Sequence, residues 1–334
     1  MASQSFAARL PDADPLADWV QQTWDLGFVV DVELINLSEN AMYRVKTDQK
    51  QVFVLRLSQP GYQTDDSIKA ELTWLQHLAD RQDLLVQTAD VIAARTGSLM
   101  QQFPGDPAWR CVLFSHIDGQ AIARVDVNST DFRTLGAAAA QLSHKPVAAA
   151  MAMARPQWRP DFFLSPTYGW GDWRRAKGVT SSIEKDLACD EQRVLTALNI
   201  TSLETQLIHG DMRAANLLRC VPSADTAAAP SIALLDFDDA VIAPAIVDLA
   251  AALSFDEDLE TLPDRVDAWL EGYRTMDILP AEQVALIPAV IMLRRLSLLG
   301  WMTTHPQAPE AIELGGDFAV RSVGLFERLT KNLV

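Results

Sequence analysis

The chain has 334 residues, of which 49% are hydrophobic and 22% charged, and 28 Lys and Arg against 44 Asp and Glu give a formal net charge of −16. This composition is typical of a globular protein with a large core, and the length predicts about two domains. The acidic charge argues against a nucleic-acid-binding protein and against one that binds an anionic membrane surface, because both of these partners attract Lys and Arg.

The cysteine spacing and the first residues of the chain predict a cytoplasmic protein. The three cysteines form no C-x-x-C pair, so neither a disulfide framework nor a zinc site is expected. They are Cys111, Cys189 and Cys220. The first twenty residues contain one Arg and three Asp and no apolar core of signal-peptide length. The apolar stretch at 284–293 is followed by Arg294 and, at about ten residues, is too short to span a bilayer.

The first third of the chain predicts helices and an antiparallel meander. Residues 16–26 have a helical pattern after Asp14 and Pro15. Three segments then show the alternation of strands and are joined by short polar turns, which is typical of antiparallel pairs. These segments are residues 29–37, 41–47 and 51–58. A helix is expected at 66–79, and further strands are expected at 90–94, 98–102 and 110–115.

Helical patterns dominate after residue 119. They cover residues 130–143, 182–198, 263–273, 281–302 and 318–333. Pro288 is expected to kink or split the fourth of these helices. The sequence therefore predicts an α+β protein with two lobes. The N-terminal lobe is residues 1–115, a hinge lies at about 114–119, and a larger, mainly helical C-terminal lobe is residues 120–334.

The strongest chemical signal is LIHGDMRAANLL at residues 207–218, followed by IALLDFDDA at residues 232–240. The polar residues concerned are His209, Asp211, Asn216 and Asp236. Their order matches the catalytic loop and the metal-binding Asp of kinases. Phosphoryl transfer needs a carboxylate that orients and deprotonates a hydroxyl, together with oxygen ligands for Mg²⁺. The plain alternative is an acidic surface loop, but an apolar strand that leads directly into Asp236 argues against it.

With these motifs the chain resembles the aminoglycoside phosphotransferase-like family, which also contains choline and homoserine kinases and has the protein-kinase-like fold. The resemblance covers most of residues 28–330, and SENAMYRV, VLRLSQPGY and GWGDWR follow in the expected order. It implies that Asp211 is the catalytic base or hydroxyl-orienting carboxylate and that Arg213 contacts the transferring phosphate. It also implies that Asn216 and Asp236 bind Mg²⁺.

Four further acidic or basic residues have supporting roles or remain open in this resemblance. His209 would lie under the catalytic loop, and Asp248 would anchor the backbone of that loop. Two readings remain open for Asp238 and Asp239, because one of them would assist a second metal ion while the other faces water.

Kinase chemistry also requires a cation on the third strand of the N-terminal lobe, paired with a helix carboxylate. Arg56 occupies that position in place of the usual Lys, and Glu71 on the following helix is its expected partner. Arg binds phosphate in a bidentate manner but is bulkier than Lys, so phosphate alignment would differ. The alternative is a surface Arg beside a helix Glu.

Backbone and small polar groups are expected to bind the nucleotide. Ser38 and Asn40 lie between the first two strands, where they would hydrogen-bond phosphates or simply form a hairpin turn. By resemblance, the backbone groups of Ser115 and Ile117 in the hinge would contact adenine or guanine. Four aromatic residues close together in the sequence would either line a pocket for a cationic ligand or fill the core. They are Trp158, Tyr168, Trp170 and Trp173.

The sequence thus predicts a kinase that uses Mg²⁺ and ATP or GTP to phosphorylate a hydroxyl of a small, cationic or zwitterionic molecule. No nucleic-acid or membrane partner is expected. Two alternatives are a bacterial protein Ser/Thr kinase of the same superfamily and a nucleotide-binding regulatory module without turnover, which only Arg56 supports. Residues 211–260 carry ten Asp and Glu against two Arg. Within them, residues 256–260 are expected to be a solvated edge, and the acidity is a weak hint of a cationic acceptor.

Overall fold

The protein is described here by a computed structural model that covers residues 8–104, 109–143, 154–166, 170–199, 203–221 and 230–333. The chain forms two compact units. Unit 1 contains Met1–Gln120 and Cys220–Asp238, and unit 2 contains Ala121–Arg219 and Asp239–Val334. The chain passes from one unit to the other within β7 (Gly119–Ala121), within β9 (Leu217–Cys220) and between Asp238 and Asp239. The segment Cys220–Asp238, which the sequence pattern places in the helical lobe, therefore packs within unit 1.

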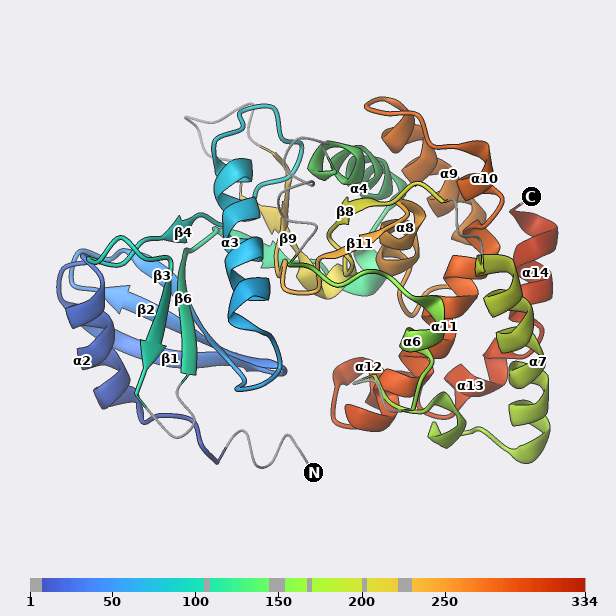
Figure 1. Ribbon diagram of the computed structural model, residues 1–334, viewed down its shortest axis with the longest axis horizontal. Helices are drawn as coiled ribbons and strands as arrows, with labels where there is room; N and C mark the ends of the chain where they lie inside the picture. The colour runs from blue at the N-terminus through green and yellow to red at the C-terminus, as the bar shows by residue number, and fades with distance from the viewer. Residues whose placement is uncertain are drawn as a thin grey trace. The chain divides into compact units, whose positions relative to one another are not determined.

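Unit 1 is built on a six-stranded antiparallel sheet (Figure 1). Its strand order is β1-β2-β3-β6-β4, and β5 also pairs with β6. The strands are β1 Val29–Leu37, β2 Asn40–Thr47, β3 Val52–Ser58, β4 Val91–Ile92, β5 Met100–Phe103 and β6 Trp109–Ser115. The predicted meander is confirmed, because β1 pairs antiparallel with β2 and β2 with β3. The β1–β2 register shifts between Val29 and Asp31 and again between Leu34 and Asn36.

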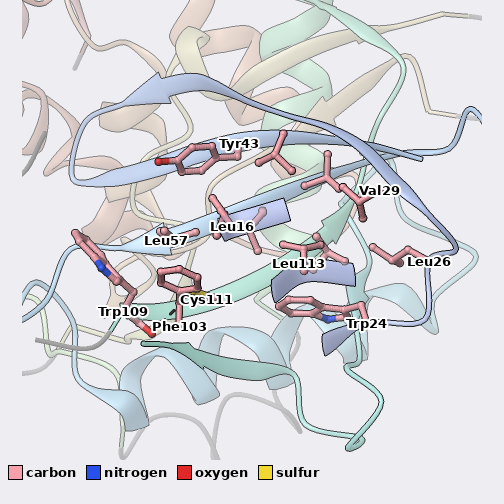
Figure 2. Packing of buried hydrophobic residues seen from close by; sticks show 14 of the residues in the cluster. Leu16, Trp24, Leu26, Val29, Tyr43, Leu57, Phe103, Trp109, Cys111 and Leu113 are labelled. Carbon is pink, nitrogen blue, oxygen red and sulfur yellow. Dashed lines mark hydrogen bonds between the residues drawn. The ribbon is translucent and has the colours of Figure 1, made fainter. Parts of the chain in front are cut away.

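Helix α2 (Ala13–Thr23) contributes to the hydrophobic core of this sheet (Figure 2). Leu16 and Val20 are fully buried in a cluster with sheet residues that include Leu57 and Leu113. Trp24, directly after the helix, donates its ring N–H to the carbonyl of Ile92 at 3.0 Å. Apolar burial and one partly buried hydrogen bond thus connect helix α2 and Trp24 to the sheet.

Two further elements of unit 1 bring polar residues close to the sheet. Helix α3 (Asp65–Ala79) begins at Thr64, whose hydroxyl accepts a hydrogen bond from the Ser67 N–H at 3.1 Å, as expected of an N-cap. Strand β10 (Ile232–Leu234) is fully buried and is held by two backbone hydrogen bonds of 2.9 Å to Gln87. The acidic residues that follow β10 are thereby placed by a fixed strand.

Unit 2 is mainly helical (Figure 1). Its helices are α4 Ser129–Leu142, α6 Pro160–Phe163, α7 Ser181–Leu198, α8 Ile246–Ala252, α9 Leu262–Arg274, α10 Ala281–Val284, α11 Ile287–Thr304, α12 Pro309–Leu314, α13 Asp317–Ser322 and α14 Leu325–Asn332. A short antiparallel pair, β8 (Gln206–Ile208) and β11 (Val241–Ala243), lies among them. Helix α11 is buried along most of its length and contacts α7, α8, α13 and α14.

Two of the long helices that the sequence pattern predicts are each divided in the structure. Residues 281–302 form α10 and α11, and Pro288 lies in the first turn of α11, where its missing N–H breaks no helical hydrogen bond. Residues 318–333 form α13 and α14, and Gly324 between them adopts a left-handed φ of +67°. Within the described residues, no helix has both the length and the apolar character needed to cross a membrane.

Helices α4 and α9 approach each other through a pair of glycines. A Cβ placed on Gly136 would lie 1.9 Å from the carbonyl oxygen of Trp269. A Cβ placed on Gly272 would lie 1.9 Å from the carbonyl oxygen of Arg133. Both obstacles are backbone atoms, so a side chain at either position must separate the two helices.

We therefore predict that Gly136→Ala and Gly272→Ala each destabilise the protein. Alanine would gain about 1 kcal/mol of helix propensity, but separation of the helices costs more, so a net loss of about 2 kcal/mol is expected. Urea unfolding would measure it, with Thr134→Ala on the exposed side of α4 as the control that changes little. Unchanged or higher stability of the glycine variants would contradict the packing described for α4 and α9.

Candidate active site

The loop after β8 is held by a buried carboxylate. Asp248 in α8 accepts hydrogen bonds from the backbone N–H groups of His209 (3.2 Å) and Gly210 (2.7 Å). Gly210 has a φ of +84°, and a Cβ there would lie 2.5 Å from the carbonyl oxygen of Asp239. The Nδ1 of His209 accepts the Asp211 N–H at 3.2 Å. The contacts expected of His209 and Asp248 with this loop are thus present.

Three side chains donate hydrogen bonds to the carboxylate of Asp211. Arg294 Nη2 lies 2.5 Å from Oδ1, whereas Arg213 Nε (3.0 Å) and Asn216 Nδ2 (2.9 Å) both donate to Oδ2. Asn216 Nδ2 also donates to the Asp211 carbonyl at 2.8 Å. The structure therefore brings together Asp211, Arg213 and Asn216, as the sequence pattern implies, and adds Arg294.

Burial and charge act in opposite directions on the two carboxylates of this loop. Burial alone would raise the pKa of Asp211, but Arg213 and Arg294 outweigh it and hold that pKa below its usual value of 3.8. For Asp248, burial outweighs the two backbone N–H donors and raises the pKa to about 7. Asp211 is therefore kept as an anion, ready to accept a hydrogen bond from a hydroxyl.

Arg294 is a site residue that the sequence pattern did not predict. It lies on α11, where Nε donates to the hydroxyl of Ser254 at 2.8 Å and the guanidinium carbon lies 4.8 Å from the ring centre of Trp170. The one signal in the sequence was an Arg pair after an apolar run in a helix. Such residues need a buried acidic partner, and that partner is distant in the chain.

In unit 1, Arg56 and Glu71 form a fully buried ion pair. Arg56 Nη1 and Nη2 donate to the two carboxylate oxygens of Glu71 at 2.7 and 2.8 Å, and the side chains are 3% and 1% exposed. The guanidinium carbon also lies 5.4 Å from the ring centre of Phe114. Burial would lower the pKa of Arg56, but Glu71, with Asp238 and Asp236, raises it. The expected pairing is present, and the alternative of a surface Arg is wrong.

The turn between β1 and β2 is connected to the acidic segment after β10. Asn40 is buried and donates to Oδ2 of Asp238 at 2.7 Å, and Gln63 donates to the Asp238 carbonyl at 2.5 Å. Ser38 is exposed and closes the turn with its N–H on the Asn40 carbonyl at 3.0 Å. Asn40, expected to bind phosphate, and Asp238, expected to assist a metal ion, therefore contact each other.

Asp236 differs from Asp238 in exposure and backbone conformation. Its side chain is exposed, and its φ of +65° lies in the left-handed region, which is strained for a residue other than glycine. The neighbouring Phe237 is buried edge-on against Trp74, with ring centres 5.1 Å apart, and holds the segment in place. A fixed strand thus presents one exposed carboxylate.

The donor types of Asn216 and Asp236 fit Mg²⁺, which takes carboxylate and amide oxygens and keeps several positions for water and phosphate. Asn216 uses its amide nitrogen on Asp211, so the amide oxygen is the atom suited to a cation. Among the described residues, no group of three or more His, Cys, Asp or Glu is arranged to hold a metal ion. Asn216 belongs to unit 2 and Asp236 to unit 1, so their joint role as ligands stays a prediction.

The hinge residues Ser115 and Ile117 contact other parts of the protein. The N–H of Ser115 donates to the Asp90 carbonyl at 2.9 Å, and Ile117 is buried. Contacts of their backbone groups with a nucleotide base stay a prediction.

The aromatic residues differ in burial. Trp173 is buried, with Arg174 4.4 Å from its ring centre. Trp158 packs partly buried beside β8 and β11, and Tyr168 lies outside the described residues.

The buried ion pair leads to a stability prediction. Arg56→Met and Glu71→Leu should each cost about 3–5 kcal/mol, because each leaves one charge buried without its partner. The double variant should recover much of this loss, since neither charge of the pair remains buried without its partner. Urea unfolding would measure all three, with Glu33→Gln as the control, because that residue's pair with Arg44 is exposed and worth about 1 kcal/mol or less. Equal small losses in all variants would contradict the buried pair.

A second prediction concerns the pH dependence of stability. The pKa of Asp248 is raised from 3.8 to about 7 in the folded protein, so the folded state binds the proton more tightly. Asp248 therefore contributes a free energy of unfolding that falls as pH rises from about 4 to about 7 and then stays level.

In Asp248→Asn this component is absent, and the decrease in stability over that pH range should be smaller by on the order of a few kcal/mol. Urea unfolding at a series of pH values would measure the change. Asp264→Asn, at an exposed position in the first turn of α9, is the matched control and should keep the wild-type pH dependence. An unaltered pH dependence in Asp248→Asn would contradict the raised pKa.

The chain matches one protein family and several solved structures. A model of the APH phosphotransferase enzyme family matches residues 31–279. A microcompartment-associated aminopropanol kinase is 29% identical, with a TM-score of 0.79 over 96% of this chain and 98% of that chain. An amicoumacin kinase solved with AMP-PNP and Ca²⁺ is 16% identical, with a TM-score of 0.71 over 97% and 96% of the two chains.

A spectinomycin phosphotransferase solved with ADP is 13% identical, with a TM-score of 0.64 over 96% of this chain and 98% of that chain. A search of curated proteins finds no match. The similarity to the solved structures establishes a kinase-like fold, with an antiparallel sheet in the N-terminal part and a helical C-terminal part. Because the family model covers more than half of the sequence, the chain belongs to the APH phosphotransferase enzyme family.

Proposed function

We propose that the protein is a Mg²⁺-dependent kinase that transfers the γ-phosphate of ATP or GTP to a hydroxyl of a small, amine-bearing molecule. The observation that carries this proposal is the carboxylate of Asp211, which is held by three side-chain donors and placed on a loop anchored by Asp248. Arg213 and Arg294 also hold the pKa of Asp211 below its usual value. A fixed, anionic hydrogen-bond acceptor is what orientation of an attacking hydroxyl requires.

In this proposal Asp211 accepts the hydrogen bond of the acceptor hydroxyl and receives its proton as the new oxygen–phosphorus bond forms. Arg213 lies beside the same carboxylate, where it would stabilise negative charge on the transferring phosphoryl group. Asn216 and Asp236 would hold Mg²⁺, which when bound supplies charge neutralisation at the nucleotide phosphates. Arg56 would support the phosphates from unit 1, while its pair with Glu71 keeps its position fixed.

Two observations support an amine-bearing acceptor. The aminopropanol kinase that is 29% identical over nearly the whole chain is named for an amino alcohol, in which a hydroxyl and an amine lie close together. The net charge of −16 also favours a cationic over an anionic acceptor at long range. The substrate class we propose is therefore a small amino alcohol or a larger molecule that contains one.

The proposal predicts that Asp211→Asn folds and binds nucleotide but loses phosphate transfer by about 10²–10⁴-fold, because the acceptor hydroxyl loses its base. A transfer assay with Mg-ATP and Mg-GTP would test it on aminopropanols, ethanolamine, choline, homoserine, sugars and aminoglycosides. Asp264→Asn serves as the matched control and should keep wild-type turnover.

Three outcomes would contradict parts of this proposal. Near wild-type turnover in Asp211→Asn would exclude Asp211 as the base. Transfer to a protein Ser or Thr, with no small acceptor accepted, would favour the protein kinase alternative. Nucleotide binding without transfer to any acceptor would favour a regulatory module.

A further inference from the structure

Arg294 contacts the proposed base and is itself rigidly placed. Its Nη2 lies 2.5 Å from Oδ1 of Asp211, its Nε donates to Ser254 at 2.8 Å, and its side chain is 10% exposed. Trp170 covers the guanidinium at 4.8 Å. Trp170 is placed by Gly171, which has a φ of +90° and where a Cβ would lie 2.5 Å from the Gly300 carbonyl oxygen. Helix α11 thus fixes both Arg294 and the aromatic ring above it.

The two oxygens of Asp211 differ in how many donors they already have. Each carboxylate oxygen accepts about two hydrogen bonds. Oδ2 has two side-chain donors, Arg213 and Asn216, whereas Oδ1 has one, Arg294. Among the described residues, no second side chain donates to Oδ1. The Asp211 side chain is still 9% exposed, so a ligand hydroxyl is able to reach it.

We propose that the acceptor hydroxyl binds at Oδ1 of Asp211, beside Arg294 and Trp170, and that Arg294 is the positioning residue that aims this oxygen. The inference rests on the proposed function. In the step concerned, the hydroxyl oxygen bonds to the γ-phosphorus, the bond from that phosphorus to the β-phosphate oxygen breaks, and the hydroxyl proton passes to Oδ1. The nucleoside diphosphate is the leaving group.

Arg213 and Arg294 contact different oxygens of Asp211, so their removal should have different effects. Arg213 shares Oδ2 with Asn216 and is 26% exposed, so Asn216 still holds Oδ2 when Arg213 is removed. Nothing replaces Arg294 at Oδ1, and the carboxylate then gains rotational freedom about its Cβ–Cγ bond. A misplacement of about 1 Å at a reacting group is sufficient for a rate loss of about 10²-fold.

The experiment compares Arg294→Met, Arg294→Lys and Ser254→Ala with the full-length wild-type protein. Mg-ATP is the donor, and aminopropanol or the best acceptor from the screen is the second substrate. We expect Arg294→Met to lower kcat about 100-fold, with the Kd for Mg-ADP within about twofold of wild type. Arg294→Lys should restore part of kcat, since Lys keeps the charge but lacks the fork that contacts both Asp211 and Ser254. Ser254→Ala should give an intermediate loss.

Arg174→Met is the matched control. Arg174 also lies over a tryptophan, with 4.4 Å to the Trp173 ring centre, and pairs with Glu191, but it does not contact Asp211. Its kcat should stay within about twofold of wild type, because only the contact with Asp211 positions the base. Millimolar guanidinium should restore activity to Arg294→Ala and leave Arg174→Ala unchanged, a result that a purely structural role of Arg294 would not give.

Failure of this inference is distinguishable from failure of the proposed function. If wild type turns over and Arg294→Met keeps kcat within about threefold, the kinase assignment stands and the role of Arg294 is wrong. If wild type binds Mg-ADP but phosphorylates nothing, the proposed function fails. The contact itself is then tested by thermal unfolding of Arg294→Met, Asp211→Asn and the double variant, whose Tm shifts should be non-additive. Additive shifts would overturn the inference.

Discussion

The burial of the Asp211 carboxylate is the constraint on which much of unit 2 depends. A buried carboxylate is unstable unless cations and donors compensate for lost water, and Asp211 has two arginines and an amide. One of these arginines lies within a core helix, so it needs partners of its own, which Ser254 and Trp170 supply. The segment 170–174, with Gly171 packed on Gly300, is therefore connected to the proposed base through Arg294.

The same constraint acts in unit 1 with the signs reversed. There the cation Arg56 is buried, and the bidentate contact with Glu71 compensates for it. Arg in place of Lys suits this arrangement, because the planar guanidinium matches a carboxylate with two parallel hydrogen bonds and packs on Phe114. Arg56 was the one sequence feature in favour of a non-catalytic module. In the structure, the same residue fits the local packing of this sheet.

Local patterns in the sequence predicted the six strands of the large sheet and most of the helices, because alternation and helical spacing depend on near neighbours in the chain. The pairing of Arg56 with Glu71 was predicted from the requirements of kinase chemistry instead. Contacts between distant residues were not predictable in this way. Arg294 lies 83 positions from Asp211, and Asn40 lies 198 positions from Asp238. The break at Gly324 was missed for a related reason, since apolar spacing continues across it and only the left-handed backbone reveals the turn.

The acidic residues at 211–260 have partners in the structure that change the interpretation of their charge. The expected solvated edge is wrong for its first three residues, because each is paired with arginines from elsewhere in unit 2. The pairs are Asp256 with Arg124 and Arg265, Glu257 with Arg295, and Asp258 with Arg295 and Arg321.

A carboxylate that is buried against an arginine contributes little to the field outside the protein, since the two charges cancel over a few ångströms. At least four of the ten acidic residues in 211–260 are therefore neutralised by arginines of unit 2, and the Asp211 carboxylate itself lies between two of these arginines. Attraction of a cationic acceptor must come from exposed carboxylates, and close to the reacting hydroxyl the cationic neighbours Arg213 and Arg294 oppose it. An amine on the acceptor is consequently best accommodated away from Oδ1, so amino alcohols should differ as substrates according to the distance between their two groups.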